Sequence, residues 1–232
     1  MSEASEKVAG VEQIPIFPLP LVLLPGELLP LHIFEPRYRR MLEDIQLERN
    51  LFGVLLFDPQ ESMEAKPAPG IVGCVAEIRE SHTLPDGRSN ILSTGIIRFR
   101  IREYVEADVP YLVGRVAFFE DEPASDSETE SLVAEVSDLF ERVAKAAFKI
   151  SGSRGRFPEI PKTSPEQLSF LITAAFNLDI ALKYELLEMT STFERLNRLK
   201  TMLAKTVDKM EENAELTKLA RSNGHGTKNI DT

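Results

Sequence analysis

The sequence predicts an α+β fold in which a β-rich half precedes a helical half. Up to Phe119 the apolar residues occur in short runs typical of strands, and turn residues separate these runs. Between Glu120 and Glu135 seven side chains are acidic and none is basic. Beyond this stretch the apolar residues recur at helical spacing. We therefore place the boundary between the halves in the acidic stretch.

The first half contains five runs with the length and composition of strands. They are residues 51–57, 71–78, 89–94, 96–101 and 111–119. Pro85 to Arg88 lies between two of these runs and predicts a hairpin turn, because Asp and Gly tolerate positive φ. One helix interrupts the strands, since Pro36 suits a first helical turn and apolar residues then keep helical spacing to about Glu48. Mainly antiparallel sheet is expected.

The second half contains several helix start signals. Ser127 with Glu130, and Ser191 with Glu194, have the spacing of capping boxes. Ser164 precedes a proline at a first helical position, and Asp179 can cap a further helix. The expected division is therefore an N-terminal extension (1–13), a β-rich subdomain (14–119), an acidic linker (120–131), a helical subdomain (132–212) that includes a loop at 151–161, and a polar C-terminal tail (213–232).

Composition restricts the classes of function. The chain has 27 Lys and Arg against 37 Asp and Glu, and a net charge of −10 disfavours a protein that mainly binds nucleic-acid phosphates. The single cysteine, Cys74, cannot form an intramolecular disulfide, and the three histidines lack the spacing of zinc ligands. Five prolines interrupt the apolar stretch 14–34, so no membrane span is expected there. We expect a cytoplasmic protein without a metal or other cofactor.

The sequence carries no motif for catalysis. It has no GxxxxGK[ST] phosphate-binding loop, no GxGxxG turn and no GxSxG nucleophile elbow. Its serines and lysines show no spacing that marks a nucleophile and its base. We therefore predict that the protein is not an enzyme.

A resemblance to a known family rests on one long N-terminal stretch and four shorter runs. They are IPIFPLPLVLLPGELLPLHIFEPRYRRML, LFGVLL, IVGCVAEI, LPDGR and STGIIRFRI. In this order they resemble the N-terminal, substrate-recognition domain of Lon proteases, in the form that occurs as a free-standing small protein in bacteria. The similarity extends from Ile14 to about Lys205, because the later helices also resemble those of the family.

The resemblance implies a PUA-like β pseudo-barrel subdomain followed by a helical bundle. The ATPase module and the Ser-Lys proteolytic domain of Lon proteases have no counterpart in this sequence. The implied role is therefore a non-catalytic protein-interaction module. The implied partners are unfolded or partly unfolded polypeptides, together with a separate protease or chaperone, and the oligomeric state stays open.

The leading hypothesis is a groove that holds polypeptide segments. The candidate residues are Leu23, Leu24, Leu28 and Leu29 from the apolar run, and Glu35 and Arg37 from the pattern of the family. Two other interpretations stay open. The leucines can simply fill the core, and Glu35 and Arg37 can pair with backbone or with the helical half.

The alternative hypothesis is an anion or nucleic-acid site on a strand. Arg98, Arg100 and Arg102 alternate with apolar residues, so in a strand the three arginines share one face. If that face is solvated, it can equally be paired with acidic neighbours. On an exposed face, replacement of all three arginines by glutamine is expected to leave the fold intact.

Overall fold

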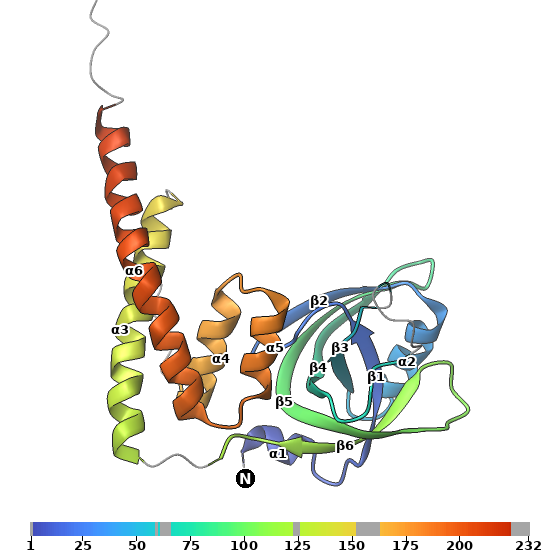
Figure 1. The fold of residues 1–232 in the computed structure, drawn as a ribbon. Coiled ribbons are helices and arrows are strands. Elements are labelled where there is room, and N and C mark those ends of the chain that lie inside the picture. The colour runs from blue at the N-terminus through green and yellow to red at the C-terminus, as the bar shows by residue number, and fades with distance from the viewer. Residues whose placement is uncertain (1, 59, 61–65, 123–125, 152–162, 224–232) are drawn as a thin grey trace, which may run out of the picture. The chain divides into compact units, whose positions relative to one another are not determined.

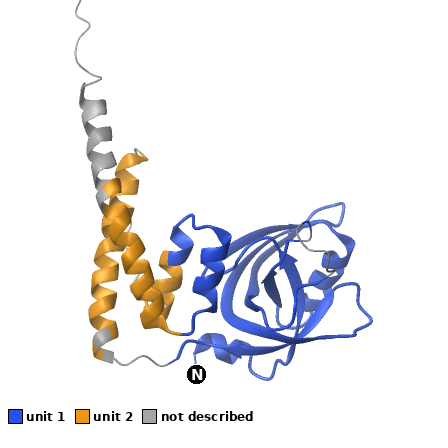
Figure 2. Cartoon of the chain, viewed as in Figure 1, with its two compact units in different colours: residues 1–122, 173–190 blue, residues 123–172, 191–232 orange. Residues whose placement is uncertain are grey.

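The computed structural model describes residues 2–58, 60, 66–122, 126–151 and 163–223 (Figure 1). The chain forms two compact units (Figure 2). The first, which we call the barrel unit, contains Met1–Glu122 and Thr173–Thr190. The second, the helical unit, contains Pro123–Ile172 and Ser191–Thr232.

The barrel unit is built around one mixed sheet of six strands. They are β1 (Gln13–Leu19), β2 (Leu28–Ile33), β3 (Leu51–Leu56), β4 (Val72–Thr83), β5 (Ser89–Val105) and β6 (Leu112–Phe119). Five of them close a ring in the order β5-β4-β3-β1-β6, because β6 also pairs with β5. Only the β1–β3 pair is parallel. The sheet is therefore mainly antiparallel, as the pattern of strands predicted, and it closes into the pseudo-barrel that the family resemblance implied.

Strand β2 lies outside the closed ring. It pairs with β5 in an antiparallel register from Leu28↔Thr94 to Ile33↔Ser89. Strand β5 is long enough for both roles, because its first part pairs with β2 and β4 and its second part with β4 and β6. Strand β2 stands at the end of the strand order, so its second edge is unpaired among the described residues.

Alternating side chains build the core of the barrel unit. Ile16, Phe52, Phe99 and Ile101 are completely buried. Gly53 leaves the space that the Phe99 ring occupies, since a Cβ there would lie 2.7 Å from the tip of that ring. The predicted helix is present as α2 (Pro36–Gln46). Its four buried residues belong to a hydrophobic cluster that also contains Phe52; they are Tyr38, Met41, Leu42 and Ile45.

Two more helices belong to the barrel unit, α1 (Glu3–Lys7) and α5 (Ile180–Glu188). The place of α5 differs from the expected division, in which the helical subdomain covered 132–212 and included this helix. Hydrogen bonds between residues far apart in the sequence hold α5 against the rest of the barrel unit. The Val72 N–H donates to the Tyr184 hydroxyl at 3.0 Å, and Lys183 Nζ donates to Glu27 at 2.7 Å.

The helical unit consists of α3 (Asp126–Ile150), the first part of α4 (Pro165–Ala175) and α6 (Thr192–Asn223). Helices α3 and α6 lie side by side (Figure 1). Two expected start signals form: Ser164 exchanges two hydrogen bonds of 3.2 Å with Gln167, and Ser191 Oγ accepts from the Glu194 N–H. In the barrel unit, Asp179 caps α5 as expected, accepting from the Leu182 N–H at 2.9 Å.

Two boundaries in the helical half differ from the expected ones. Helix α3 begins at Asp126, inside the expected linker 120–131, and acidic residues stabilise the positive end of a helix dipole. Helix α6 continues to Asn223, although a tail was expected from 213, because Ala, Glu, Leu and Lys in this segment favour helix. The expected loop at 151–161 lies outside the described residues beyond Ser151.

None of the described helices combines the length and the apolar character that crossing a membrane requires.

Candidate functional site

The candidate leucines divide between the core and the surface. Leu23, Leu24 and Leu29 are at least 93% buried, whereas Leu28 is 61% exposed. Three of the four therefore fill the core, in line with the alternative interpretation, and are not available for a partner. The direct neighbours Leu28 and Leu29 differ because successive side chains of a strand point to opposite faces.

The backbone of β2 presents polar groups at its unpaired edge. The Gly95 N–H donates to the Glu27 carbonyl at 2.9 Å, so the backbone of Glu27 faces β5. The N–H and C=O groups of successive residues in a strand point to opposite edges. Those of 29, 31 and 33 therefore point towards β5, and those of Leu28, Pro30 and His32 point away from it. Pro30 fits this assignment, because it has no N–H to donate to β5. The unpaired edge therefore offers two N–H donors, of Leu28 and His32, and three carbonyl acceptors.

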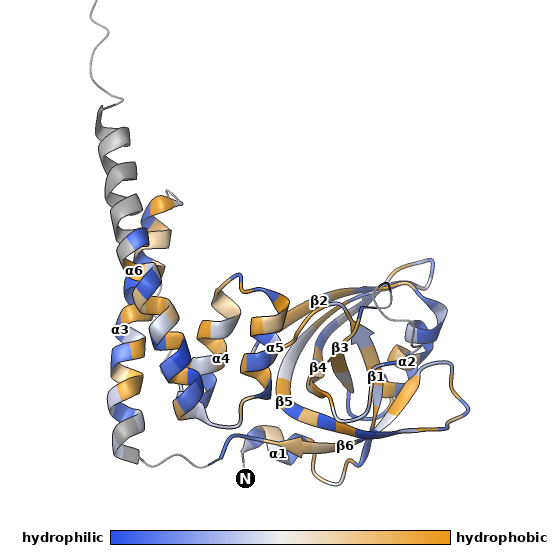
Figure 3. Ribbon diagram, in the orientation of Figure 1, coloured by the Kyte–Doolittle hydropathy of each residue, from blue (hydrophilic) through white to orange (hydrophobic). Residues whose placement is uncertain are grey.

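Apolar side chains accompany this unpaired edge. Phe34, directly after β2, is 58% exposed, and its ring stacks on that of His32 with 6.1 Å between centroids. The His32 ring is held by a hydrogen bond of 2.7 Å between Nδ1 and Asn90 Oδ1. Most of β2 is coloured hydrophobic in Figure 3. We call the exposed side chains of Leu28, Pro30, His32 and Phe34, together with the outward backbone of the first three, the β2 edge.

A turn and an acidic side chain fix the start of β2. Gly26 adopts φ of 81°, a conformation that favours glycine, and its N–H donates to the Gly95 carbonyl at 2.8 Å. The Glu27 carboxylate accepts from the Leu24 N–H at 2.9 Å and from Lys183 Nζ at 2.7 Å. Glu27, the residue directly before β2, is therefore anchored to both β5 and α5.

Glu35 and Arg37 lie next to the β2 edge and pair with each other. Arg37 donates to Glu35 Oε2 from Nε at 3.0 Å and from Nη2 at 2.9 Å. The Arg37 guanidinium also lies 4.5 Å from the centre of the Tyr38 ring. Both side chains keep two-fifths or more of their area exposed, so they remain accessible beside Phe34.

The predicted arginine stripe does not form a shared exposed face. Arg98 is 1% exposed, Arg100 is half-buried and Arg102 is exposed. Arg100 Nη1 donates to the Gly70 carbonyl at 2.6 Å. The expectation of three arginines on one solvated face is therefore wrong, because α5 and the chain after β6 cover the first of them.

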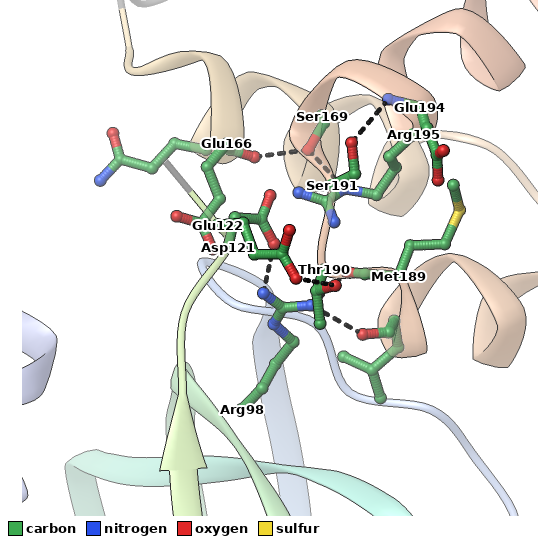
Figure 4. Close-up of polar contacts among 12 residues, drawn as sticks. Arg98, Asp121, Glu122, Glu166, Ser169, Met189, Thr190, Ser191, Glu194 and Arg195 are labelled. Atoms are coloured by element: carbon green, nitrogen blue, oxygen red, sulfur yellow. Dashed lines mark hydrogen bonds and ion pairs between the residues drawn. The ribbon is translucent and has the colours of Figure 1, made fainter. Parts of the chain in front are cut away.

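Arg98 joins three segments of the barrel unit (Figure 4). Its guanidinium donates to the carbonyls of Leu187 at 3.1 Å and Met189 at 2.5 Å, at the end of α5. It also forms a buried ion pair with Asp121 and lies 4.6 Å from the centre of the Phe119 ring. A cation at this end of a helix is stabilised by the carbonyls and by the helix dipole. We call Arg98, Asp121 and these two carbonyls the Arg98 cluster.

The single cysteine of the chain, Cys74, lies buried in β4. Complete burial raises the pKa of the Cys74 thiol to about 12, so it is protonated at neutral pH and is a poor nucleophile. Within the described part of the chain, no three His, Cys, Asp or Glu side chains come together as metal ligands.

Comparison with known proteins identifies one family. Residues 13–205 match the family model of the ATP-dependent protease La (LON) substrate-binding domain. Lon protease of Brevibacillus choshinensis is 28% identical over 204 residues, which cover 84% of this chain and 25% of that protein. Lon protease of Parabacteroides distasonis is 31% identical over 145 residues, 60% of this chain and 17% of that protein. The chain thus spans about a quarter or less of the length of these relatives.

This chain also resembles solved structures of Lon N-terminal domains, and the match covers nearly the whole of each solved chain. A Lon N-terminal domain protein from Xanthomonas campestris is 25% identical with a TM-score of 0.57, covering 82% of this chain and 97% of that one. The N-terminal domain of the Mycobacterium avium complex Lon protease has a TM-score of 0.61 at 22% identity, covering 83% and 98%. The likeness to the second structure concerns the fold alone.

Proposed function

Because the chain belongs to the Lon substrate-binding domain family, we propose that it binds unfolded or partly unfolded polypeptides at the β2 edge. The protein holds its client without a chemical step. A separate protease or chaperone would then process what it holds. The family model that matches residues 13–205 is that of a substrate-binding domain, and this fits a role in recognition.

The observation that carries this proposal is an exposed, uncharged apolar strand on an unpaired sheet edge. Leu28 and Phe34, at its two ends, are 61% and 58% exposed. Six residue steps at about 3.3 Å each separate them by roughly 20 Å, which suits a short extended segment. Exposed apolar residues grouped in this way mark interaction sites more often than scattered ones do.

The arginine alternative has no comparable support. Arg98 is engaged in the Arg98 cluster, and Arg100 donates to a carbonyl of its own chain. Only Arg102 of the three is exposed. We therefore propose no nucleic-acid or anion site on β5.

Fluorescence anisotropy with a labelled polypeptide tests the proposal. The probe is a fluorescein-labelled, reduced and carboxymethylated protein that cannot refold. The double variant Leu28→Ser, Phe34→Ser is expected to bind it at least about tenfold more weakly, because each lost apolar contact removes about 1 kcal/mol. Raising the salt concentration is expected to change the affinity of the native protein only slightly, since apolar contacts are not screened.

Leu47→Ser is the matched control. Among the described residues Leu47 is the most exposed large apolar side chain, at 86%. It directly follows α2, so the length of that helix, about 16 Å, separates it from Phe34. This variant removes a surface leucine without touching the β2 edge. Equal binding by all three proteins would contradict the proposed site, and no binding by the native protein would contradict the function.

A further inference from the structure

We infer that the client is held by strand addition: an extended segment of the polypeptide pairs with the outward backbone of β2. This inference rests on the proposed function and specifies how the same site recognises its client. The segment becomes an extra strand of the sheet, beside β2 and on the side opposite β5.

The backbone geometry of β2 selects an extended main chain as the occupant. The outward groups of Leu28, Pro30 and His32 recur every second residue, roughly 6.6 Å apart. Another extended backbone presents its own N–H and C=O groups at the same repeat, and such pairing does not depend on the side chains of the client. Recognition of this kind suits a protein whose clients share a conformation rather than a sequence.

The composition of β2 leaves this edge open to pairing. Exposed edge strands are usually protected by charged side chains, lysine above all, and by proline. Strand β2 reads LLPLHI and contains no Lys, Arg, Asp or Glu. Pro30 is its one protective residue, and it removes a single donor from the middle of the edge. A client therefore pairs on both sides of Pro30 and lacks one hydrogen bond between them.

The side chains along β2 favour a client with apolar residues at alternate positions. On the exposed face, Leu28 and Phe34 contact one set of client side chains. On the other face, Leu31 is half-buried against the core cluster beneath α2, so its outer part is free to contact the second set. An added strand would cover the exposed parts of all three side chains.

A pair of variants at His32 separates strand addition from side-chain contact alone. His32→Pro removes the ring and the outward N–H, whereas His32→Ala removes the ring and keeps the N–H. Neither substitution takes a donor from the β2–β5 ladder, because the His32 N–H points away from β5. We expect His32→Pro to bind the carboxymethylated probe at least about fivefold more weakly than His32→Ala. The proline removes one hydrogen bond to the client, and its pyrrolidine ring blocks the edge of the strand.

Pro30→Ala is the converse variant, and it decides the matter even if His32→Pro fails to fold. It supplies the missing outward N–H, so we expect about two- to tenfold tighter binding of the same probe. Amide hydrogen exchange should also show slower exchange at Leu28 and His32 when the probe is bound.

The outcomes distinguish this inference from the proposed function. If Leu28→Ser, Phe34→Ser weakens binding but the two His32 variants bind equally and Pro30→Ala changes nothing, strand addition is overturned and the proposed function stands. If the native protein binds no probe, both fall together. Concentration-dependent dimers that His32→Pro abolishes would identify a second copy of the chain as the occupant and would overturn the assignment to a client.

Discussion

Strand β2 and the second half of β5 show the same alternation of residues but meet different surroundings. In β2 the core face carries Leu29 and the other face carries the exposed Leu28. In β5 the core face carries Phe99, yet Arg98 on the opposite face is also buried. Two-residue periodicity thus identifies which side chains share a face, but it does not reveal what covers that face.

The difference between the two strands is a covering helix. Helix α5 and the chain after β6 bury the guanidinium of Arg98 and supply its partners, Asp121 and two carbonyls. No element of the described chain pairs with the outer edge of β2. The Arg98 side chain on β5 is therefore partnered within its own unit, whereas the outer backbone groups of β2 are unpaired among the described residues.

Loss of the Arg98 side chain is expected to have the largest effect on stability. Arg98→Gln removes the cation from the buried ion pair with the Asp121 carboxylate, which is 4% exposed, and breaking a buried pair in this way costs about 3–5 kcal/mol. The free energy of unfolding in urea measures the effect. Arg102→Gln, on the exposed part of the same strand, is the control and should change stability by less than about 0.5 kcal/mol. Equal effects of the two substitutions would contradict the contrast between buried and exposed arginines.

This prediction reverses the one drawn from the sequence. On a solvated face, replacement of Arg98, Arg100 and Arg102 by glutamine would be mild. The burial of Arg98 makes the triple variant unsuitable as a probe of binding, because loss of the fold would mimic loss of a site.

The buried thiol of β4 predicts a loss of stability at alkaline pH. Burial raises the pKa of Cys74 to about 12 from an ordinary value of 9.0. Between these two values the unfolded chain releases the proton while the folded chain retains it, so stability is full below about pH 9 and falls as pH rises towards 12. The slope from this one group approaches about 1.4 kcal/mol per pH unit.

Cys74→Ala provides the comparison for this prediction, because tyrosines also titrate in the same range. The difference in unfolding free energy between the native protein and the variant should shrink from pH 9 upwards. A difference that stays constant from pH 8 to pH 11 would show that the thiol is not protected by burial.

The sequence revealed the local elements of the fold well. Tyr38, Met41 and Ile45 at helical spacing predicted α2, and Ser164 and Asp179 predicted the starts of α4 and α5. These signals are local, since a cap or an apolar stripe depends on residues within a turn or two. The resemblance to Lon N-terminal domains supplied the pseudo-barrel, which local signals alone do not specify.

The contacts between distant segments were not predictable in the same way. Glu27 and Lys183 are 156 residues apart, and Arg98 meets the carbonyl of Met189 across 91 residues. Neither pair leaves a trace in periodicity or spacing. For the candidate leucines, an apolar run without clear alternation hid the fact that Leu28 alone faces outwards.

A moderate effect on stability is expected from the contact between α5 and the start of β2. Lys183→Gln removes the ion pair with Glu27. The two side chains are 19% and 23% exposed, respectively, so the loss should lower the free energy of unfolding by about 1 kcal/mol. Amide hydrogen exchange should become faster at the start of β2 and in the first turn of α5. Lys145→Gln, which removes an exposed pair within α3, is the control and should leave exchange in both segments unchanged.

The smallest effect on stability is expected at the β2 edge itself. Leu28→Ala removes a side chain that is 61% exposed, so the free energy of unfolding should change by less than about 0.5 kcal/mol. The neighbouring substitution Leu29→Ala empties a core position that is 7% exposed and should cost about 2–5 kcal/mol.

The two leucine variants give opposite results in stability and binding if the β2 edge is a client site. Leu28→Ala keeps the fold and weakens binding of the carboxymethylated probe. Leu29→Ala loses stability, yet under conditions where it remains folded it should bind as the native protein does, because its side chain points to the core. Urea unfolding and anisotropy on the same samples measure both quantities. A Leu28 variant that unfolds easily, or that binds normally while Leu29→Ala does not, would show that the apolar residues of β2 serve the core alone.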